Sequence, residues 1–310
     1  ASLRDYAAPD VTSIGMLEEA RDALDDGDSV LRANVLGRLA SASYYVFPAR
    51  ERERLIRDAI AMGRRVGDRD ALSRILLERY HVLVGPDDTE ERLAASLETA
   101  RLATEGGAIA LACEARLQAH ADLVVLDDLP GADVELAAAE RDAAEVRFGY
   151  HRWRLVLTRA MRAMMVGDHA RAEACANEAL AVARATVATQ AALQWAGQLI
   201  VLRRMQGRLD EVAAVVDAAV AKYPATFLWR SAVLVTRAER GDLAGARTLL
   251  DQMAANDFAD VPRDFGWMGA LAGIADTCGV LGDARRAATL YPMLLPYARL
   301  NVTLAHSFGG

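Results

Sequence analysis

The feature that most constrains this 310-residue chain is a glycine followed by a polar residue, which returns four times in its second half. The four segments read VGDHARAEACANEAL, QGRLDEVAAVVDAAV, RGDLAGARTLLDQMA and LGDARRAATLYPMLL. The intervals between their glycines, Gly167, Gly207, Gly241 and Gly282, are 40, 34 and 41 residues. Such periods are typical of helix–turn–helix solenoids. The chain is therefore predicted to be an array of antiparallel helix pairs.

Each position of the repeat has a physical purpose. Glycine takes the left-handed conformation that closes a helix and lets the chain reverse. The next residue starts the following helix, and an aspartate suits this place because it caps free N–H groups and is favoured by the helix dipole. A small or apolar residue five positions after the glycine lets the paired helices approach closely. The predicted caps are Asp168, Asp242 and Asp283, and the predicted close contacts are Ala172, Val212, Ala246 and Ala287.

The segment from Asp168 to Cys175 also contains His169 and Glu173, and so has the residue types of a metal or catalytic site. A metal site needs convergent ligands at defined spacing, and no fourth ligand is apparent here. The repeat explains Asp168 as a turn and cap residue and places Cys175 one helical turn beyond Ala172. We therefore interpret this cluster as structural.

Composition favours helices and excludes several classes of protein. Hydrophobic residues make up 53% of the chain, but aromatic residues only 6%, so the apolar residues are mostly Ala, Leu and Val. The formal net charge of −7 argues against direct nucleic-acid binding, which needs a positive field.

Cys113, Cys175 and Cys278 are few, far apart and odd in number, which predicts buried free thiols in a reducing compartment. The sequence has no apolar run long enough to span a membrane and no amino-terminal signal. These features predict a cytoplasmic protein without membrane contact.

The pattern extends towards the amino terminus in a weaker form. Breaks that combine Gly, Pro and Asp separate the expected helices, and no linker marks a domain boundary. We predict one all-α domain over residues 1–310, a right-handed superhelix of about seven helix pairs, with the best-defined repeats in 150–300. The chain starts without methionine and stops directly after a helix, so we expect a piece of a longer protein. The expected helices cover 12–25, 29–47, 50–66, 69–84, 88–105, 107–127, 131–147 and 150–167, followed by the repeats above.

The repeat segments resemble tetratricopeptide repeats, in which a Gly-Asp turn is followed by Ala five residues later and by another Ala after seven more. Ala179 and Ala219 match the second Ala, whereas Met253 and Leu294 depart from it. Pro224 stands where that family often places its closing proline.

Residues 79–103, 149–183 and 257–302 also resemble the helical-repeat region of large bacterial ATP-binding regulators, including LuxR-type transcription factors and ATPase–adenylyl cyclase fusions. The resemblance implies a sensor or scaffold region that controls a neighbouring effector. This chain has no GxxxxGK[ST] phosphate-binding loop, so any ATPase module lies outside it.

Neither a metal site nor a catalytic site stands out from the sequence. None of the five histidines, His81, His120, His151, His169 and His306, lies three or four residues from another. No GxSxG elbow, Cys/His pair or carboxylate dyad is apparent. We expect no enzyme activity, no cofactor and no metal.

Four tryptophans, Trp153, Trp195, Trp229 and Trp267, lie early in the first helix of successive pairs. A large aromatic side chain there fills the space between stacked repeats. The alternative, that some of them face a groove, stays open.

In the tetratricopeptide pattern the first helix of each pair lines the concave face, and counting back from the turn glycine identifies the residues placed there. Methionine side chains adapt to a ligand and arginine binds carboxylates, so this face is suited to a peptide or an apolar acidic ligand. Ordinary packing between helices is the alternative explanation of the methionines. Ser231 and Asp276 fall on the same register as the candidate residues. The candidate binding residues are Tyr150, Arg154, Met161, Met165, Gln194, Arg204, Met205 and Glu239.

The leading hypothesis is a non-enzymatic ligand- or protein-binding region of a multidomain bacterial regulator, recognising a protein, a peptide or a small-molecule inducer. The alternative is a constitutive assembly scaffold, self-association included, that takes no small-molecule ligand. A third hypothesis, an enzyme on a helical-repeat frame, has no visible catalytic arrangement behind it.

Overall fold

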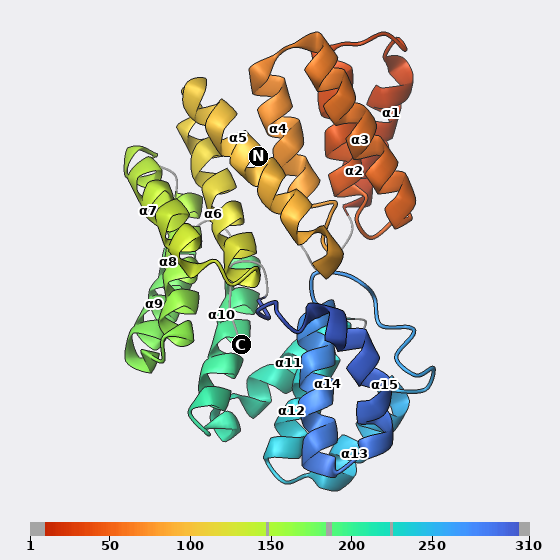
Figure 1. The fold of residues 1–310 in the computed structure, drawn as a ribbon, viewed down its shortest axis with the longest axis vertical. Coiled ribbons are helices and arrows are strands. Elements are labelled where there is room, and N and C mark those ends of the chain that lie inside the picture. The colour runs from red at the N-terminus through yellow and green to blue at the C-terminus, as the bar shows by residue number, and fades with distance from the viewer. Residues whose placement is uncertain (1–9, 147–148, 184–187, 224–225, 304–310) are drawn as a thin grey trace. The chain divides into compact units, whose positions relative to one another are not determined.

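The computed structural model describes residues 10–146, 149–183, 188–223 and 226–303. Over these residues it contains fifteen α-helices, three short 3-10 turns and no strand element. Consecutive helices run in opposite directions (Figure 1). The predicted all-α array of helix pairs is confirmed. Pro224 and His306 lie outside the described residues.

The helices divide into two compact units, each with hydrophobic clusters of its own. Unit 1 is Ala1–Val124 with Asp128–Leu155, and unit 2 is Val125–Asp127 with Val156–Gly310. The division falls inside helix α8 (Gly149–Met165). That residues 1–310 form one continuous domain stays a prediction.

Unit 1 is built around the stacking of first helices of successive pairs. Helix α2 packs against both α3 and α4, and α4 packs against α5. The main cluster of this unit joins Leu39 of α2, Ile60 of α3 and Ile75 of α4. Its helices are α1 (Val11–Ala23), α2 (Val30–Ala42), α3 (Ala49–Val66), α4 (Arg69–Tyr80), α5 (Thr89–Glu105), α6 (Ile109–Val125), α7 (Leu129–Glu145) and the first part of α8.

Unit 2 repeats this arrangement with α12 packed against α14, the first helices of two successive pairs. Leu234, Leu250, Leu271 and Ile274 are fully buried in its largest cluster. Its helices are the rest of α8, α9 (His169–Ala183), α10 (Ala188–Met205), α11 (Ala213–Lys222), α12 (Phe227–Glu239), α13 (Leu243–Met253), α14 (Trp267–Leu281) and α15 (Ala284–Leu294).

The turn glycines adopt the predicted left-handed conformation. Gly167, Gly207, Gly241 and Gly282 have φ between 65° and 87°. After each of them, the next N–H bonds a carbonyl five residues back, for example Asp168 N to Ala163 O at 2.9 Å. This is the Schellman geometry that closes an α-helix. Asp127 takes the same conformation, with φ 63°, at the turn between α6 and α7.

The aspartates after the glycines cap the second helices as predicted. Asp168, Asp242 and Asp283 each accept a hydrogen bond from the backbone N–H three residues on. Arg208 has no acceptor oxygen in its side chain, so it makes no such cap, and Leu209–Val212 form a 3-10 turn before α11 begins. Three of the four predicted close contacts, Ala172, Val212 and Ala246, are buried, and Ala287 is half-buried.

Two predicted helices extend too far. Helix α2 ends at Ala42 rather than near residue 47, and α4 ends at Tyr80 rather than near residue 84. Val82 and Leu83 are buried although they lie in the connection after α4. In the sequence, these two apolar residues continue the hydrophobic pattern of the helix before them. The helix was therefore predicted to run past its actual end at Tyr80.

The tryptophans take part in packing to different degrees. Trp153 and Trp267 are buried, whereas Trp195 and Trp229 are half-buried against the cluster between α10, α11 and α12. The Trp195 indole Nε1 donates to Asn177 Oδ1 at 3.0 Å. Packing therefore accounts for Trp153 and Trp267 in full and for the other two in part.

Candidate functional site

The first helices of three successive pairs in unit 2 contribute to one charged group at their carboxyl-terminal ends. Arg204 of α10 donates from Nε to Glu239 Oε1 of α12 at 2.6 Å. It also donates from Nη2 to Asp276 Oδ2 of α14 at 2.7 Å. Counting back from the turn glycines places all three residues on the predicted binding face, and the structure brings their side chains together. We call Arg204, Glu239 and Asp276 the Arg204 cluster.

The Arg204 cluster is open to solvent. The exposed fractions of the Arg204, Glu239 and Asp276 side chains are 37%, 29% and 54%. Arg204 Nη1 has no acceptor among the described residues, so a guanidinium donor remains available beside two carboxylates. Met205, the next residue of α10, exposes 44% of its surface. An open N–H donor next to an adaptable apolar side chain suits a ligand that carries a carboxylate or a carbonyl.

Three further candidate residues lie in unit 2. Met165 and Gln194 are half-buried. Met165 Sδ accepts a long hydrogen bond from Arg162 Nη1, at 3.9 Å. The Met161 side chain is fully enclosed in the protein. Ser231 is also buried, and its hydroxyl donates to the Ala270 carbonyl, which ties α12 to α14.

The other two candidate residues lie in unit 1, where Arg154 is buried and Tyr150 is half-buried. Arg154 Nη1 donates to Glu114 Oε1 at 2.6 Å and contacts the Tyr150 hydroxyl at 2.9 Å. Only 7% of the Arg154 side chain and 11% of the Glu114 side chain are exposed. Arg154 therefore connects α8 to α6 inside the unit, in contrast to the open Arg204.

A second buried ion pair, which sequence reasoning missed, joins α5 to α6. Arg92 donates to Asp122 Oδ1 from Nε at 3.0 Å and from Nη2 at 2.7 Å. Arg92 Nη1 also bonds the Gly85 carbonyl and so holds the connection before α5. Burial raises the pKa of Asp122 to about 6, although Arg92 opposes that rise.

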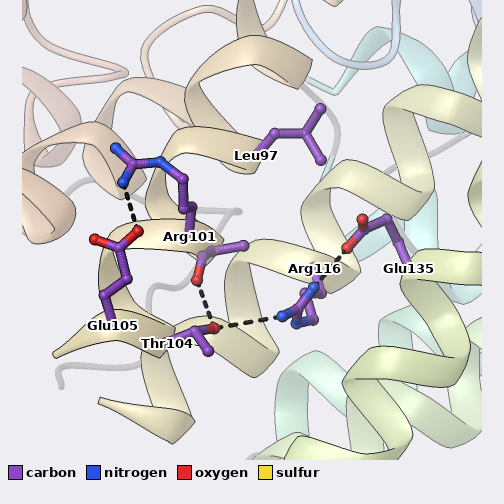
Figure 2. Close-up of a pocket in the computed structure, with 7 residues that line it drawn as sticks. Leu97, Arg101, Thr104, Glu105, Arg116 and Glu135 are labelled. Carbon is purple, nitrogen blue, oxygen red and sulfur yellow. Dashed lines mark hydrogen bonds and ion pairs between the residues drawn. The ribbon is translucent and has the colours of Figure 1, made fainter. Parts of the chain in front are cut away.

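The described part of unit 1 also has a surface hollow of about 350 Å³ between α5, α6 and α7. Figure 2 shows Arg116 of α6 facing Glu135 of α7, with the side chains of α5 opposite. Arg116 also bonds Asp142 Oδ2 at 2.9 Å and contacts the Thr104 hydroxyl at 3.3 Å. The lining residues are Leu97, Ala100, Arg101, Thr104, Glu105, Arg116 and Glu135.

The cysteines are free thiols, as predicted. Cys113 and Cys278 are buried, and Cys175 is half-buried. Burial raises the pKa of the Cys113 thiol to about 12 and that of Cys278 to about 11, so both stay protonated at neutral pH.

Within the described residues, no three His, Cys, Asp or Glu side chains are grouped to hold a metal ion. His120 contacts the Ala132 carbonyl through Nδ1, and burial lowers the pKa of the enclosed His151. None of the described helices is long and apolar enough to cross a membrane.

The sequence separation between the partners of some ion pairs is a signal that the sequence analysis did not use. Glu114 and Arg154 are 40 residues apart, and Arg204 and Glu239 are 35 apart, so each pair is separated by about one repeat. Opposite charges one repeat apart on equivalent helices are therefore candidates for contact. The partners of Arg92 and Arg116 lie within neighbouring helices at shorter separations and follow no such period.

This arrangement of helix pairs defines the chain as an all-α, tetratricopeptide-like helical-repeat protein. Among solved structures it is similar to the crystal structure of a Rap protein complexed with Competence and Sporulation Factor, with a TM-score of 0.68. The match has 16% sequence identity and covers 91% of this chain and 78% of that chain. A scan against protein-family models finds no match, and a search of curated proteins finds none.

Proposed function

We propose that this chain is a non-enzymatic binding module of a bacterial regulator, and that the Arg204 cluster is the centre of its binding face. The observation that carries the proposal is the meeting of Arg204, Glu239 and Asp276 from three successive first helices in a solvent-open group. Side chains on the same face of successive repeats form an extended surface, which is how solenoid proteins bind partners.

The proposed ligand is a peptide or a peptide-like segment of a protein. The similar Rap structure holds Competence and Sporulation Factor, which supports a bound partner on this type of fold. The free Nη1 of Arg204 would bond a ligand carboxylate or carbonyl, and Met205 would contact an apolar side chain.

Ligand binding is proposed to act on the spacing of the first helices. Arg204 holds Glu239 of α12 and Asp276 of α14 at once, so a ligand that competes for the guanidinium loosens both connections. Because repeats contact only their neighbours, small rotations between them add along an array. The regulated effector is proposed to be a module of a LuxR-type or cyclase-linked regulator in the cytoplasm.

A selection from a random peptide library tests this function. The wild-type chain is expected to enrich peptides with a shared sequence pattern. Arg204→Gln should weaken binding of the selected peptide by about tenfold, the loss of one charged hydrogen bond. Arg240→Gln is the matched control, because Arg240 is exposed and, among the described residues, forms its ion pair with Asp210 alone. Failure to enrich any pattern, or equal losses in both variants, would refute the proposal.

A constitutive scaffold is the second candidate function. Tyr291 of α15 exposes 65% of its surface, and Leu295, in the 3-10 turn directly after that helix, exposes 52%. Exposed apolar side chains favour association. Sedimentation of the free chain distinguishes the two functions. A stable oligomer that Tyr291→Glu converts to a monomer supports the scaffold, whereas a monomer at all concentrations excludes self-assembly.

A further inference from the structure

Arg52, near the start of α3, is enclosed in unit 1 without a carboxylate partner. It exposes 7% of its surface, and no carboxylate of the described residues lies within ion-pair distance of its guanidinium. Arg52 Nη1 donates to the Val82 carbonyl over a long 3.5 Å, and the buried Nε has no acceptor in the described chain. A guanidinium has five N–H donors and is rarely enclosed unless it is paired. The fold therefore gives no reason for a charge at this position.

Arg92 of α5 shows what Arg52 lacks, because the two arginines occupy equivalent positions in successive repeats. They are 40 residues apart. In both helices, the next buried positions follow the arginine at offsets of three, four, seven, eight, ten and eleven residues. Identical burial over almost the whole helix means that the two side chains start from the same place in their repeats.

The groups that these two arginines reach are equivalent as well. Arg92 donates from Nε and Nη2 to the carboxylate of Asp122, which lies 30 residues further along the chain. Arg52 also reaches the residue 30 positions further on, but this is Val82, which offers only its backbone carbonyl. Both Val82 and Asp122 are buried. The site of Arg52 therefore has the cation of a buried ion pair without the anion.

The pKa values of the two arginines differ in the same sense. Burial would lower the pKa of Arg92, but the carboxylate of Asp122 outweighs this effect and raises that pKa above its ordinary value. Burial lowers the pKa of Arg52, and the opposing effects of Tyr44 and Glu53 do not cancel the fall. An anion beside Arg52 would supply the compensation that Arg92 receives from Asp122.

Aromatic and apolar surface lies beside the Arg52 guanidinium. Arg52 Cζ lies 4.6 Å from the centre of the Tyr44 ring, and this cation–π contact holds the planar group in place. The next two residues, Tyr45 and Val46, lie in the turn after α2 and expose 46% and 47% of their surface. A fixed guanidinium beside such surface suits a carboxylate that is attached to an apolar group.

We propose that Arg52 binds the carboxylate of a ligand, which takes the place that the Asp122 carboxylate has beside Arg92. The ligand oxygens accept hydrogen bonds from the guanidinium, and the apolar part of the ligand lies against Tyr45 and Val46. The carboxylate belongs to a small apolar acid or to the free end of a peptide. This site uses no residue of the Arg204 cluster, so its failure would leave the proposed function unaffected.

Calorimetric titration of the full chain with defined carboxylates tests the proposal. The probes are phenylacetate and a tripeptide with a free carboxyl-terminal phenylalanine, and each is compared with its uncharged amide. Both carboxylates should bind and raise the melting temperature, because a ligand that binds only the folded state stabilises it. The amides should do neither. Binding of the tripeptide at least about tenfold tighter than phenylacetate assigns the site to a peptide end, and a smaller difference assigns it to a small acid.

Two glutamine variants locate the bound carboxylate. Arg52→Gln should weaken binding of phenylacetate by at least about tenfold, the loss of a charged hydrogen bond. Arg57→Gln is the matched control, because it makes the same charge change on the exposed face of the same helix. It should weaken binding by less than about twofold. Circular dichroism melting confirms that each variant folds.

The stability of the chain without ligand distinguishes a binding arginine from a structural one. Arg52→Met keeps an apolar stem and removes a cation that has no carboxylate partner, so it should not lower the melting temperature. Arg92→Met leaves Asp122 buried without its cation and should lower the melting temperature by several degrees.

The contrary outcomes are equally distinct. The proposal is wrong if neither carboxylate binds, if the amides bind as tightly as the acids, or if Arg52→Gln and Arg57→Gln weaken binding equally. A melting temperature that falls as far in Arg52→Met as in Arg92→Met would make Arg52 a structural residue. Binding of inorganic phosphate as tightly as phenylacetate would show a general attraction of anions and would overturn the assignment to a carboxylate.

Discussion

Two arginines that occupy candidate positions in the two units have opposite surroundings. Arg154 of unit 1 is enclosed with Glu114, whereas Arg204 of unit 2 is open to solvent between Glu239 and Asp276. Position in the repeat predicts which helix face a residue occupies, but it does not predict whether that face is covered. A buried ion pair that loses one partner leaves an uncompensated charge, whereas an exposed pair contributes little to stability.

The largest effect is expected from Arg154→Ala. This change leaves Glu114 buried without its partner and should lower the free energy of unfolding by about 3–5 kcal/mol. Arg204→Ala should lower it by less than about 1 kcal/mol. Urea unfolding of both variants measures the difference. If Arg154→Ala lost less than about 1 kcal/mol, the two arginines would not differ in their contribution to stability, and Arg154 would again be a candidate binding residue.

The next prediction concerns the packing that brings Asp276 within reach of Arg204. A Cβ on Gly273 of α14 would lie 2.8 Å from Ser231 Oγ and 3.0 Å from Val235 Cγ2, both on α12. Gly273→Val should therefore cost about 1–3 kcal/mol by overpacking. Gly279→Val is the control, because a Cβ at Gly279 would meet no atom of the described residues within 4 Å apart from its own stretch of helix. Thermal unfolding of both variants checks the difference, and similar melting temperatures would contradict it.

A pH-dependent effect distinguishes Asp122 of unit 1 from Glu173 of unit 2. The pKa of Asp122 is raised to about 6 by burial, above the unfolded value of about 3.9. Its stabilising contribution is therefore fully present below the unfolded value and is lost as the pH rises through about 6. The unfolding free energy of wild type relative to Asp122→Asn should rise by an amount on the order of 1–3 kcal/mol from pH 7 to pH 4.

For Glu173 of unit 2, the expected change of stability with pH has the opposite sign. Its hydrogen bond with Arg203 lowers its pKa, so any stability that it contributes is lost as the pH falls. The free energy of unfolding of wild type relative to Glu173→Gln should therefore not rise as the pH is lowered. Urea unfolding at several pH values measures both differences. A wild-type advantage over Asp122→Asn that stays constant with pH would show that Asp122 titrates normally.

Smaller effects than those of Arg154→Ala and Gly273→Val are expected at the repeat turns. Asp168→Ala should cost about 1 kcal/mol, because the side chain caps the first turn of α9. Asp242→Ala should have a similar effect on α13. Zinc added during the unfolding measurement should change neither value. Stabilisation of wild type by zinc that Asp168→Ala abolishes would instead make this segment a metal site.

The sequence predicted the fold better than the site. The spacing of Gly167, Gly207, Gly241 and Gly282 identified the turns because left-handed backbone is a local requirement with a clear residue signature. Asp127 shows the limit of that signature, since an aspartate takes the same conformation at a turn that has no glycine there.

The site was only partly predictable, for a physical reason. Counting back from the turn glycines grouped Arg204 with Glu239 and Asp276, because it placed all three on one face of successive first helices, and the structure brings these side chains into contact. Burial of Met161 and Arg154 depends on contacts with several helices at once, which no local pattern encodes. The hollow beside Arg116 was missed because its residues have no common spacing.

The central claim, that Arg204 binds the ligand and Arg154 supports the fold, is tested most directly by side-chain nuclear magnetic resonance. Arginine Nε–H signals of the ¹⁵N-labelled chain would be followed while the selected peptide is added. We expect the Arg204 signal to shift until the binding saturates, while the Arg154 signal stays in place. A shift confined to Arg154, or no shift at Arg204 once the peptide is bound, would contradict it.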